Sequence, residues 1–287
     1  MTLNSRGILK MRVDATSYED ASRRVVQLAT EGRSSYVCVA SVHMVMEAFD
    51  SEAFRQVVNG ADLVTPDGKP LTWALRALGV PRASQVRGTD LTTHVIERAA
   101  HAHIPIGLYG GTPELLDTFA GVLKARYPGI QIVCQIAPPF RPLTPEEDEA
   151  VTQEIEESGA RILFVGIGCP KQETWMAEHK GRIATVMLGV GAAFDFHTGR
   201  IRQAPRWMQT AGLEWVFRLM MDPKRLWKRY AKHNPRFVGL FLLQLLGLRQ
   251  FHRTGADHPN LPNADAGESR PPTADYRVKH TDKVGWR

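Results

Sequence analysis

The chain has 287 residues, 43% of them hydrophobic, and a formal net charge of +6. This length and apolar content suit one large domain, alone or with an appendage, and argue against several full domains. The first residues lack the long apolar stretch of a secretory signal, and no segment reaches transmembrane length, which predicts a cytoplasmic protein. Cys38, Cys134 and Cys169 are odd in number and far apart, so we expect buried thiols and neither a disulfide framework nor a zinc site.

Short apolar runs alternate with amphipathic segments over the first two thirds of the chain. Two of the amphipathic segments carry helix start signals, a Thr followed by Pro and Glu, at Thr112 and Thr144. Strands that alternate with helices predict parallel βαβ units, and therefore a three-layer, Rossmann-like α/β core over residues 1–204. The expected strands are Tyr36–Ala40, Ala61–Val64, Ile104–Tyr109, Ile130–Cys134, Arg161–Val165 and Ala184–Leu188.

Ligands of such sheets bind beyond the carboxyl ends of the strands, and an acidic turn follows the second expected strand there. In Thr65-Pro66-Asp67-Gly68 the Pro and Gly restrict the turn, which holds the Asp67 carboxylate in one place. The turn is compatible with a catalytic acid or base. In an isolated turn of this kind, a carboxylate that makes an Asx turn or caps the next helix is the more common case.

Glycine-bearing loops follow three further strands, at Gly110, at Gly166 to Glu173, and at Gly189 to Asp195. Glycines let a ligand approach the backbone, and a helix that begins near Pro170 would offer N–H groups to a phosphate. The glycine spacing matches neither the dinucleotide fingerprint nor the P-loop. Each loop alone is also typical of a structural tight turn, but together they favour a shared nucleotide cleft.

The sequence contains no Asp-x-Asp pair, with which many nucleotide-sugar enzymes hold a divalent metal on the diphosphate. We therefore expect no metal and no other cofactor. Arginine side chains, which bind phosphate oxygens in pairs, would neutralise the diphosphate instead.

The C-terminal part concentrates the positive charge beside the most apolar segment. Residues 205–253 carry ten Lys/Arg and two acidic residues, a net +8, so the rest of the chain is slightly acidic. The apolar run Phe237–Leu248 is too short to cross a bilayer, so we predict a basic amphipathic appendage over residues 205–252 that lies on an anionic membrane. A core or dimer-interface helix stays open as the alternative. Residues 253–287 are polar and are predicted to be a disordered tail.

Several ordered motifs lie between Ile8 and Leu248, at Ala61–Trp73, Gly88–Leu91, Gly107–Pro113, Val165–Trp175, Gly189–Asp195, Gly212–Trp215 and Asn234–Phe237. In this order they resemble the WecG/TagA/CpsF glycosyltransferases. Members of this family transfer a sugar from a UDP-sugar to an undecaprenyl-diphosphate-linked saccharide, with inversion, at the cytoplasmic face of the membrane. One departure is Ser41, at a position where many relatives carry Asn.

The resemblance implies that Asp67 is the general base that deprotonates the acceptor hydroxyl. Gln172 and Asp195 would be polar contacts to the donor. The appendage would close over the site, and three of its arginines would bind the diphosphate. The full set of implied substrate-binding residues is Ser41, Thr65, Arg87, Gly110, Gly166, Gly168, Gln172, Glu173, Gly191, Asp195, Arg218, Arg225 and Arg229.

The resemblance therefore implies a peripheral inner-membrane hexosyltransferase of cell-surface polysaccharide synthesis. It would act on a UDP-sugar donor and a lipid-linked saccharide acceptor, with homo-oligomer formation left open. Two other classes are weighed against it. A nucleotide-dependent oxidoreductase fits the glycine loops but lacks the dinucleotide fingerprint. A nucleic-acid-binding protein fits the overall basicity, but the cations lie beside a lipid-like apolar run.

Overall fold

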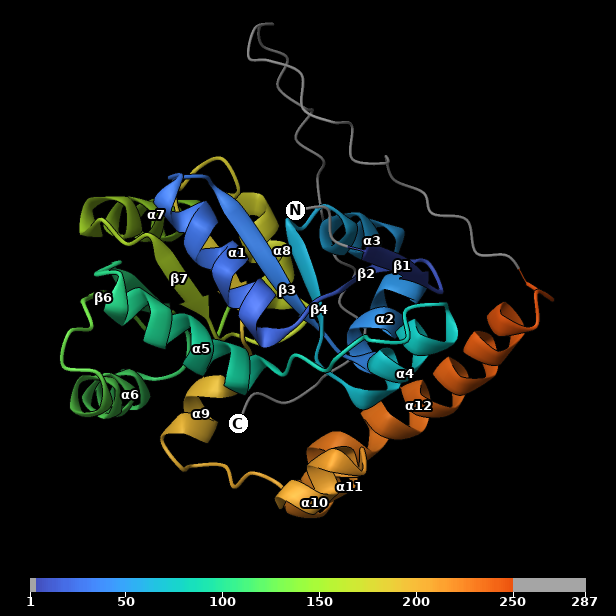
Figure 1. Ribbon diagram of the computed structural model, residues 1–287. Helices are drawn as coiled ribbons and strands as arrows, with labels where there is room; N and C mark the ends of the chain where they lie inside the picture. The colour runs from blue at the N-terminus through green and yellow to red at the C-terminus, as the bar shows by residue number, and fades with distance from the viewer. Residues whose placement is uncertain (1–3, 250–287) are drawn as a thin grey trace, which may run out of the picture.

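The computed structural model describes residues 4–249 and has at its centre a six-stranded parallel sheet flanked by helices on both faces (Figure 1). The predicted α/β class is confirmed, and each of the six expected strands is present with bounds shifted by up to two residues. The predicted tail, 253–287, and the last residues of the predicted appendage lie outside the described residues. The strand order is β4-β3-β8-β7-β5-β6, with β3 at Ser35–Ala40, β4 at Leu63–Pro66, β5 at Ile106–Tyr109, β6 at Ile132–Ile136, β7 at Ile162–Val165 and β8 at Val186–Gly189.

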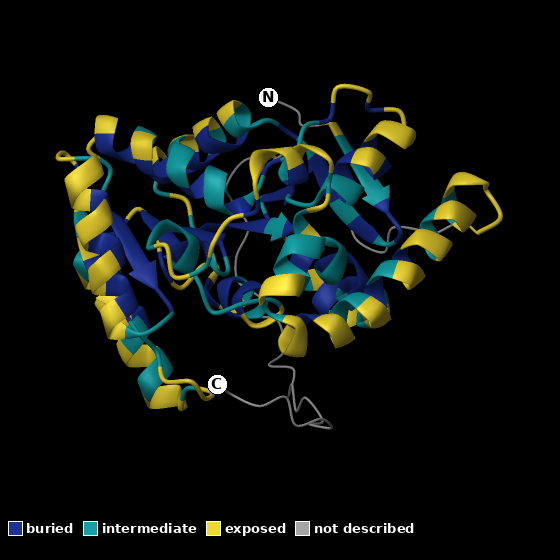
Figure 2. Cartoon of the chain, turned by 90° about the horizontal axis from the view of Figure 1, so that it is seen from below, coloured by how far each residue is buried: buried dark blue, intermediate teal, exposed yellow. Residues whose placement is uncertain are grey.

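Side chains of successive strand residues point to opposite faces of the sheet, and this alternation divides the core into two clusters. In β7, Ile162 and Phe164 pack into one cluster while Leu163 and Val165 pack into the other. Figure 2 shows that the buried residues gather in the sheet and on the helix sides turned toward it. The sheet is thus the middle of three layers, as the runs of apolar residues predict.

One face of the sheet is covered by α1 (Tyr18–Thr30), α5 (Gly88–His101), α6 (Pro113–Arg126) and α9 (Ala193–His197). The other is covered by α2 (Val42–Asp50), α3 (Glu52–Asn59), α4 (Lys69–Ala77), α7 (Pro145–Ser158) and α8 (Lys171–His179). Thr112 and Thr144 accept hydrogen bonds from first-turn backbone N–H groups of α6 and α7, which confirms the two start signals. Cys38 and Cys134 are buried, Cys169 is partly buried, and all three are free thiols.

A two-stranded antiparallel hairpin, β1 (Asn4–Ile8) and β2 (Met11–Ala15), precedes the sheet and was not predicted. Its apolar residues Ile8, Met11 and Val13 are fully buried in the same cluster as α2 and α3. Asp14 accepts a hydrogen bond from the Val64 backbone N–H at 2.8 Å, which attaches the hairpin to β4. Five-residue strands with few apolar positions give a weak periodic signal, so the hairpin is visible only in the folded chain.

The described part of the appendage forms α10 (Arg206–Thr210), α11 (Glu214–Met221) and the long α12 (Pro223–Leu245), which packs along α2. Phe237 is 4% exposed in the core cluster, and Arg236 makes two hydrogen bonds, of 2.8 and 2.7 Å, to the Asp50 carboxylate. Near the end of α12, the Gln244 side chain bonds the backbone of Gly7 and Leu9 in the hairpin turn, at 2.8 Å each. One side of α12 is therefore built into the core.

None of the helices within residues 4–249 combines the length and hydropathy needed to cross a membrane.

Replacing Phe237 with Ala should lower the free energy of unfolding by about 3 kcal/mol, because it removes a buried aromatic ring and leaves a cavity between α12 and the core. Val238→Ala is the matched control, since Val238 is the next residue on α12 and is 55% exposed. It should change stability by less than about 0.5 kcal/mol. Urea unfolding followed by circular dichroism measures both. Equal effects of the two substitutions would contradict the docked orientation of α12.

Candidate active site

A cavity of about 550 Å³ lies where the carboxyl ends of β4, β3, β8 and β7 meet the appendage. Its volume is in the range typical of small-molecule sites. The sheet side contributes the residues that follow each of these four strands, and α10 to α12 close the cavity from the other side. The lining includes Ser41, Asp67, Arg87, Gly168, Gln172 and Gly191 from the core, and Arg218, Arg225 and Arg229 from the appendage. These nine predicted site residues, far apart in sequence, are brought together.

The helices that begin at this cavity lack the side-chain caps found elsewhere in the sheet layers. The N-cap residues of α2, α4, α5 and α8 make no side-chain cap hydrogen bond. In contrast, α1, α3, α6 and α7 are capped by Ser or Thr side chains. Ser41 is a good capping residue type, yet its hydroxyl does not cap α2 and it lines the cavity. The uncapped ends turn partial positive charge toward the cavity, which suits an anionic ligand.

Asp67 follows β4 directly and its carboxylate reaches across to the start of α5. Its Oδ1 accepts a hydrogen bond from the Gly88 backbone N–H at 3.0 Å, and its own backbone oxygen accepts one from the Gln85 side chain at 2.5 Å. The side chain is partly exposed to the cavity and does not cap α4, whose N-cap is Gly68. The local turn is thus held from two sides, and the second carboxylate oxygen has no hydrogen bond within the described residues.

The surroundings of Asp67 make its carboxyl a stronger base than an ordinary aspartate. Loss of solvent on burial, and then the negative charge of Glu214, raise the pKa of Asp67 to about 6. The hydrogen bond from Gly88 and the positive charges of Arg218 and Arg87 act in the opposite direction. At neutral pH the carboxylate is ionised and has a pKa suited to accepting a proton.

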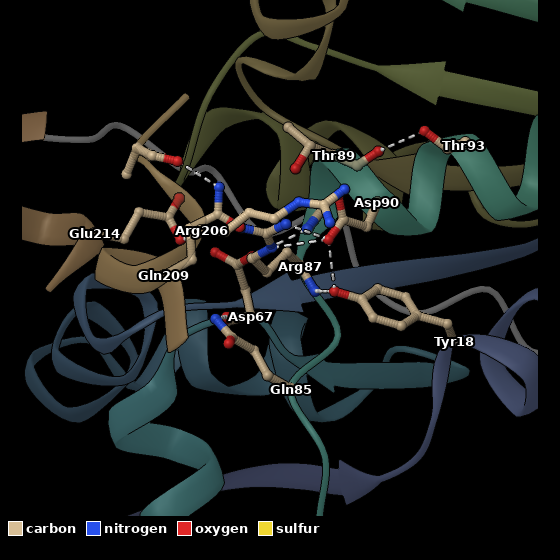
Figure 3. A network of polar contacts seen from close by, with 12 residues as sticks. Tyr18, Asp67, Gln85, Arg87, Thr89, Asp90, Thr93, Arg206, Gln209 and Glu214 are labelled. Atoms are coloured by element: carbon tan, nitrogen blue, oxygen red, sulfur yellow. Dashed lines mark hydrogen bonds and ion pairs between the residues drawn. The ribbon is translucent and has the colours of Figure 1, made fainter. Parts of the chain in front are cut away.

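Arg87, at the N-cap of α5, links the core to the appendage (Figure 3). Its guanidinium bonds the Asp90 carboxylate, with Nε at 2.8 Å, and also donates to the Gln209 side chain of α10. Its Nη1 lies 3.7 Å from Oε2 of Glu214, at the start of α11. Arg87, which is predicted to contact the substrate, therefore also holds α10 and α11 over the cavity.

Gln172 holds the two glycine loops at the ends of β7 and β8 in a fixed relation. Its Oε1 accepts hydrogen bonds from the backbone N–H groups of Gly168 at 3.2 Å and Gly191 at 3.1 Å. Its amide donates to the Glu173 carboxylate at 2.7 Å, which orients the side chain. Glu173 is fully buried, and burial raises its pKa to about 7. Both residues shape the cavity wall through these bonds.

The three predicted arginines of the appendage all line the cavity, but they differ in their present partners. Arg225 pairs with Asp222 at 2.7 Å, and the Arg218 guanidinium lies 5.7 Å from the centre of the Phe196 ring. Arg229 stacks near Tyr230, and its buried Nε has no hydrogen-bond partner among the described residues. A buried guanidinium nitrogen without an acceptor favours an anionic ligand at this position.

Five of the predicted contacts lie outside the cavity lining, and their ligand roles stay predictions. Thr65 is fully buried, and Asp195 is half-buried in α9, where burial raises its pKa. Gly110 and Gly166 approach each other closely: a Cβ on Gly110 would lie 2.7 Å from the Gly166 backbone, and one on Gly166 would lie 2.8 Å from the Phe194 ring. These two glycines allow tight packing at the ends of β5 and β7. The fifth predicted contact outside the lining is Glu173, whose carboxylate accepts the hydrogen bond from the Gln172 amide.

The cavity also contains polar residues that the sequence analysis did not select. They include His43, Lys69, Gln85, Thr89, Gln209, Glu214, Tyr230, His233 and Asn234. Glu214 belongs to the motif Gly212–Trp215, and this motif is the one sequence feature that could have identified it as a site residue. Nothing in the motif indicates that Glu214 faces Asp67. Gly212 has a φ of +75°, and a Cβ there would lie 2.9 Å from the Trp73 ring, so glycine lets α11 begin against α4.

Asp67→Asn should stabilise the protein at pH 7.5 by about 1–2 kcal/mol, because it removes a partly buried charge while its side-chain oxygen can still accept the Gly88 bond. A carboxyl whose pKa is raised in the folded state loses its stability contribution as pH rises from about 4 toward 6. The gain should therefore vanish near pH 4. Urea unfolding at both pH values measures it, with the exposed Asp117→Asn as control. A destabilised Asp67→Asn protein at pH 7.5 would contradict this account of the carboxylate.

One protein-family model matches nearly all of the described part of the chain. The model of the glycosyl transferase WecG/TagA/CpsF family matches residues 6–251, which includes the sheet, the cavity and α10 to α12. The match spans most of the chain and every element that lines the site. Taken with the parallel sheet and the single carboxylate turn, it shows that the chain belongs to the WecG/TagA/CpsF family and is a glycosyltransferase of cell-surface polysaccharide synthesis.

Proposed function

We propose that this chain is an inverting, metal-independent glycosyltransferase that moves a hexose-type sugar from a UDP-sugar to a polyprenyl-diphosphate-linked saccharide. The observation that carries the proposal is the position of Asp67. One carboxylate with a raised pKa lies in a cavity whose other charged groups are mainly arginines and whose wall contains uncapped helix ends.

In the proposed reaction Asp67 acts as the general base. Its carboxylate takes the proton of the acceptor hydroxyl while the hydroxyl oxygen attacks the anomeric carbon of the donor. The bond from that carbon to the UDP oxygen breaks, and UDP leaves from the opposite face with the bonding electrons. Such a single displacement inverts the anomeric centre and needs one base, whereas a double displacement would also need an enzyme nucleophile.

Arginines and backbone dipoles would balance the charge of the leaving UDP in place of a divalent ion. Arg218, Arg225 and Arg229 lie on the appendage side of the cavity, and the uncapped ends of α2 and α4 lie on the sheet side. Guanidinium groups bind phosphate oxygens through paired hydrogen bonds, which stabilises developing charge without a metal. The donor diphosphate would thus lie between α2 and α12.

We further propose that the appendage seats the enzyme on the cytoplasmic face of the inner membrane. The docked side of α12 holds Phe237 and Gln244, while its opposite side exposes a row of apolar residues. An exposed apolar row of this kind, flanked by cations, suits the headgroup layer of an anionic membrane. The exposed apolar residues are Trp227, Val238, Leu242, Leu243 and Leu245, with Leu246 and Leu248 just beyond the helix.

The role of Asp67 is tested by Asp67→Asn, which should lower kcat by about a thousandfold while leaving the Kd for UDP within about threefold. The wild-type rate should rise with pH through about 6, as the carboxylate ionises. Transfer is measured with a UDP-sugar and a short lipid-diphosphate acceptor, and UDP binding by calorimetry. The exposed Glu149→Gln is the control. Normal turnover by Asp67→Asn would exclude it as the base.

In the same assay, the rate of Glu214→Gln should rise with pH at a lower pH than the rate of the wild type. The substitution removes the nearby negative charge that raises the pKa of Asp67. An unchanged limb would show that Glu214 does not act on the base.

The membrane role is tested by Leu242→Glu combined with Leu246→Glu, which should weaken binding to vesicles that contain anionic phospholipid at least tenfold. The two leucines are 51% and 69% exposed, so the fold should tolerate the change. Val122→Glu with Val133→Glu, both 39% exposed, is the matched control. Co-sedimentation with vesicles measures binding. Unchanged sedimentation, or loss of a dimer in place of loss of vesicle binding, would contradict the membrane assignment.

A further inference from the structure

Two histidines and a glutamate meet where α12 packs on α2, at the edge of the cavity. His43 and Glu47 are four residues apart, so they lie on the same side of α2, and His233 faces them from α12. Nε2 of His43 and Nε2 of His233 each lie 3.5 Å from the same glutamate oxygen, Oε1 of Glu47. The three donor atoms all lie within 4.8 Å of one another.

The two distances from the histidine nitrogens to the Glu47 oxygen match the spacing of ligands around a common ion better than the length of a direct hydrogen bond. An N–H···O hydrogen bond has its donor and acceptor at about 2.7–3.2 Å, and both 3.5 Å contacts are longer. Two ligands at about 2.1 Å from a tetrahedral zinc ion lie about 3.4 Å apart. Two of the three ligand pairs therefore already have the spacing of metal ligands. Only the distance between the two histidine nitrogens would have to shorten when an ion binds.

His233 is buried with neither ring nitrogen in a hydrogen bond of normal length. It is 3% exposed, and its Nδ1 is buried without a hydrogen-bond partner among the described residues. A buried imidazole with one nitrogen unpaired and the other at a long distance from its acceptor is poorly satisfied. Coordination to an ion between His233 and Glu47 would satisfy the Nε2 side of the ring.

The chemistry of the donors selects the class of ion. Imidazole nitrogens with one carboxylate suit Zn²⁺, Co²⁺ and related transition ions, whereas Mg²⁺ and Ca²⁺ prefer all-oxygen sites. Positive side chains near the site, Arg229, Lys232 and Arg236, further disfavour ions that bind by charge alone. Arg236 is already paired with Asp50 on α2.

We propose that His43, Glu47 and His233 bind a zinc-class divalent ion that fastens α12 to α2. His43 and His233 both line the cavity, so the ion would lie at its edge, with a role confined to the contact between the two helices. This ion is separate from the diphosphate counter-charge assigned to the arginines, and the proposal does not depend on the transferase reaction.

The test uses the full-length chain, freed of any affinity tag and treated with a chelator, and then titrated with Co²⁺. One equivalent should bind with the intense visible bands of four- or five-coordinate Co²⁺, and Zn²⁺ should displace it. Zn²⁺ at a hundredfold excess over its Kd should raise Tm by about 5 °C. Substoichiometric binding, or only the weak bands of six-coordinate Co²⁺, would overturn the proposal.

Variants locate the ion. Glu47→Gln and His233→Asn should each abolish both the Co²⁺ bands and the Tm shift, while His101→Asn, at an exposed histidine of α5, should retain them. Retention of both signals in Glu47→Gln and His233→Asn would refute the site. If His233→Asn does not fold, anomalous scattering at the zinc edge from wild-type crystals decides: a peak between α2 and α12 supports the proposal, and its absence there overturns it.

Discussion

The site of this enzyme depends on one guanidinium, that of Arg87, which joins the sheet to the helices that cover it. Asp90 holds Arg87 at the start of α5, and from there it reaches Gln209 and Glu214 on α10 and α11. Because Glu214 is held close in this way, its charge contributes to the raised pKa of Asp67. The basicity of Asp67, which follows β4, thus depends in part on whether the appendage is in place.

The residues of the long C-terminal helix, α12, have three roles that differ with the side of the helix on which they lie. Phe237 and Gln244 attach it to the core, Arg229 faces the cavity, and Leu242 is exposed. The roles also follow position along the helix: its Lys and Arg residues end at Arg236, and most of its exposed apolar residues follow from Val238 onward.

The sequence was sufficient for the sheet and for the place of Asp67, because buried parallel strands form continuous apolar runs and ligands bind beyond their ends. It was insufficient where a role depends on a distant partner. The sequence does not show that the Gln172 oxygen accepts hydrogen bonds from the N–H groups of two loops, and its predicted donor contact stays a prediction. Nor does it show that Gly110 packs against the Gly166 backbone, and its ligand role also stays a prediction. No local pattern brings His43 to His233.

The attachment of α12 to the hairpin turn through Gln244 has a consequence for how the enzyme is made. The wall of the cavity that carries Arg218, Arg225 and Arg229 comes from the last described helices, so it is the last part of the site to be synthesised. The sheet and its glycine loops can assemble earlier, since domains form from the N-terminus as the chain emerges. Until α12 has emerged from the ribosome and Gln244 has reached the hairpin, the nascent chain therefore holds only the sheet side of the cavity.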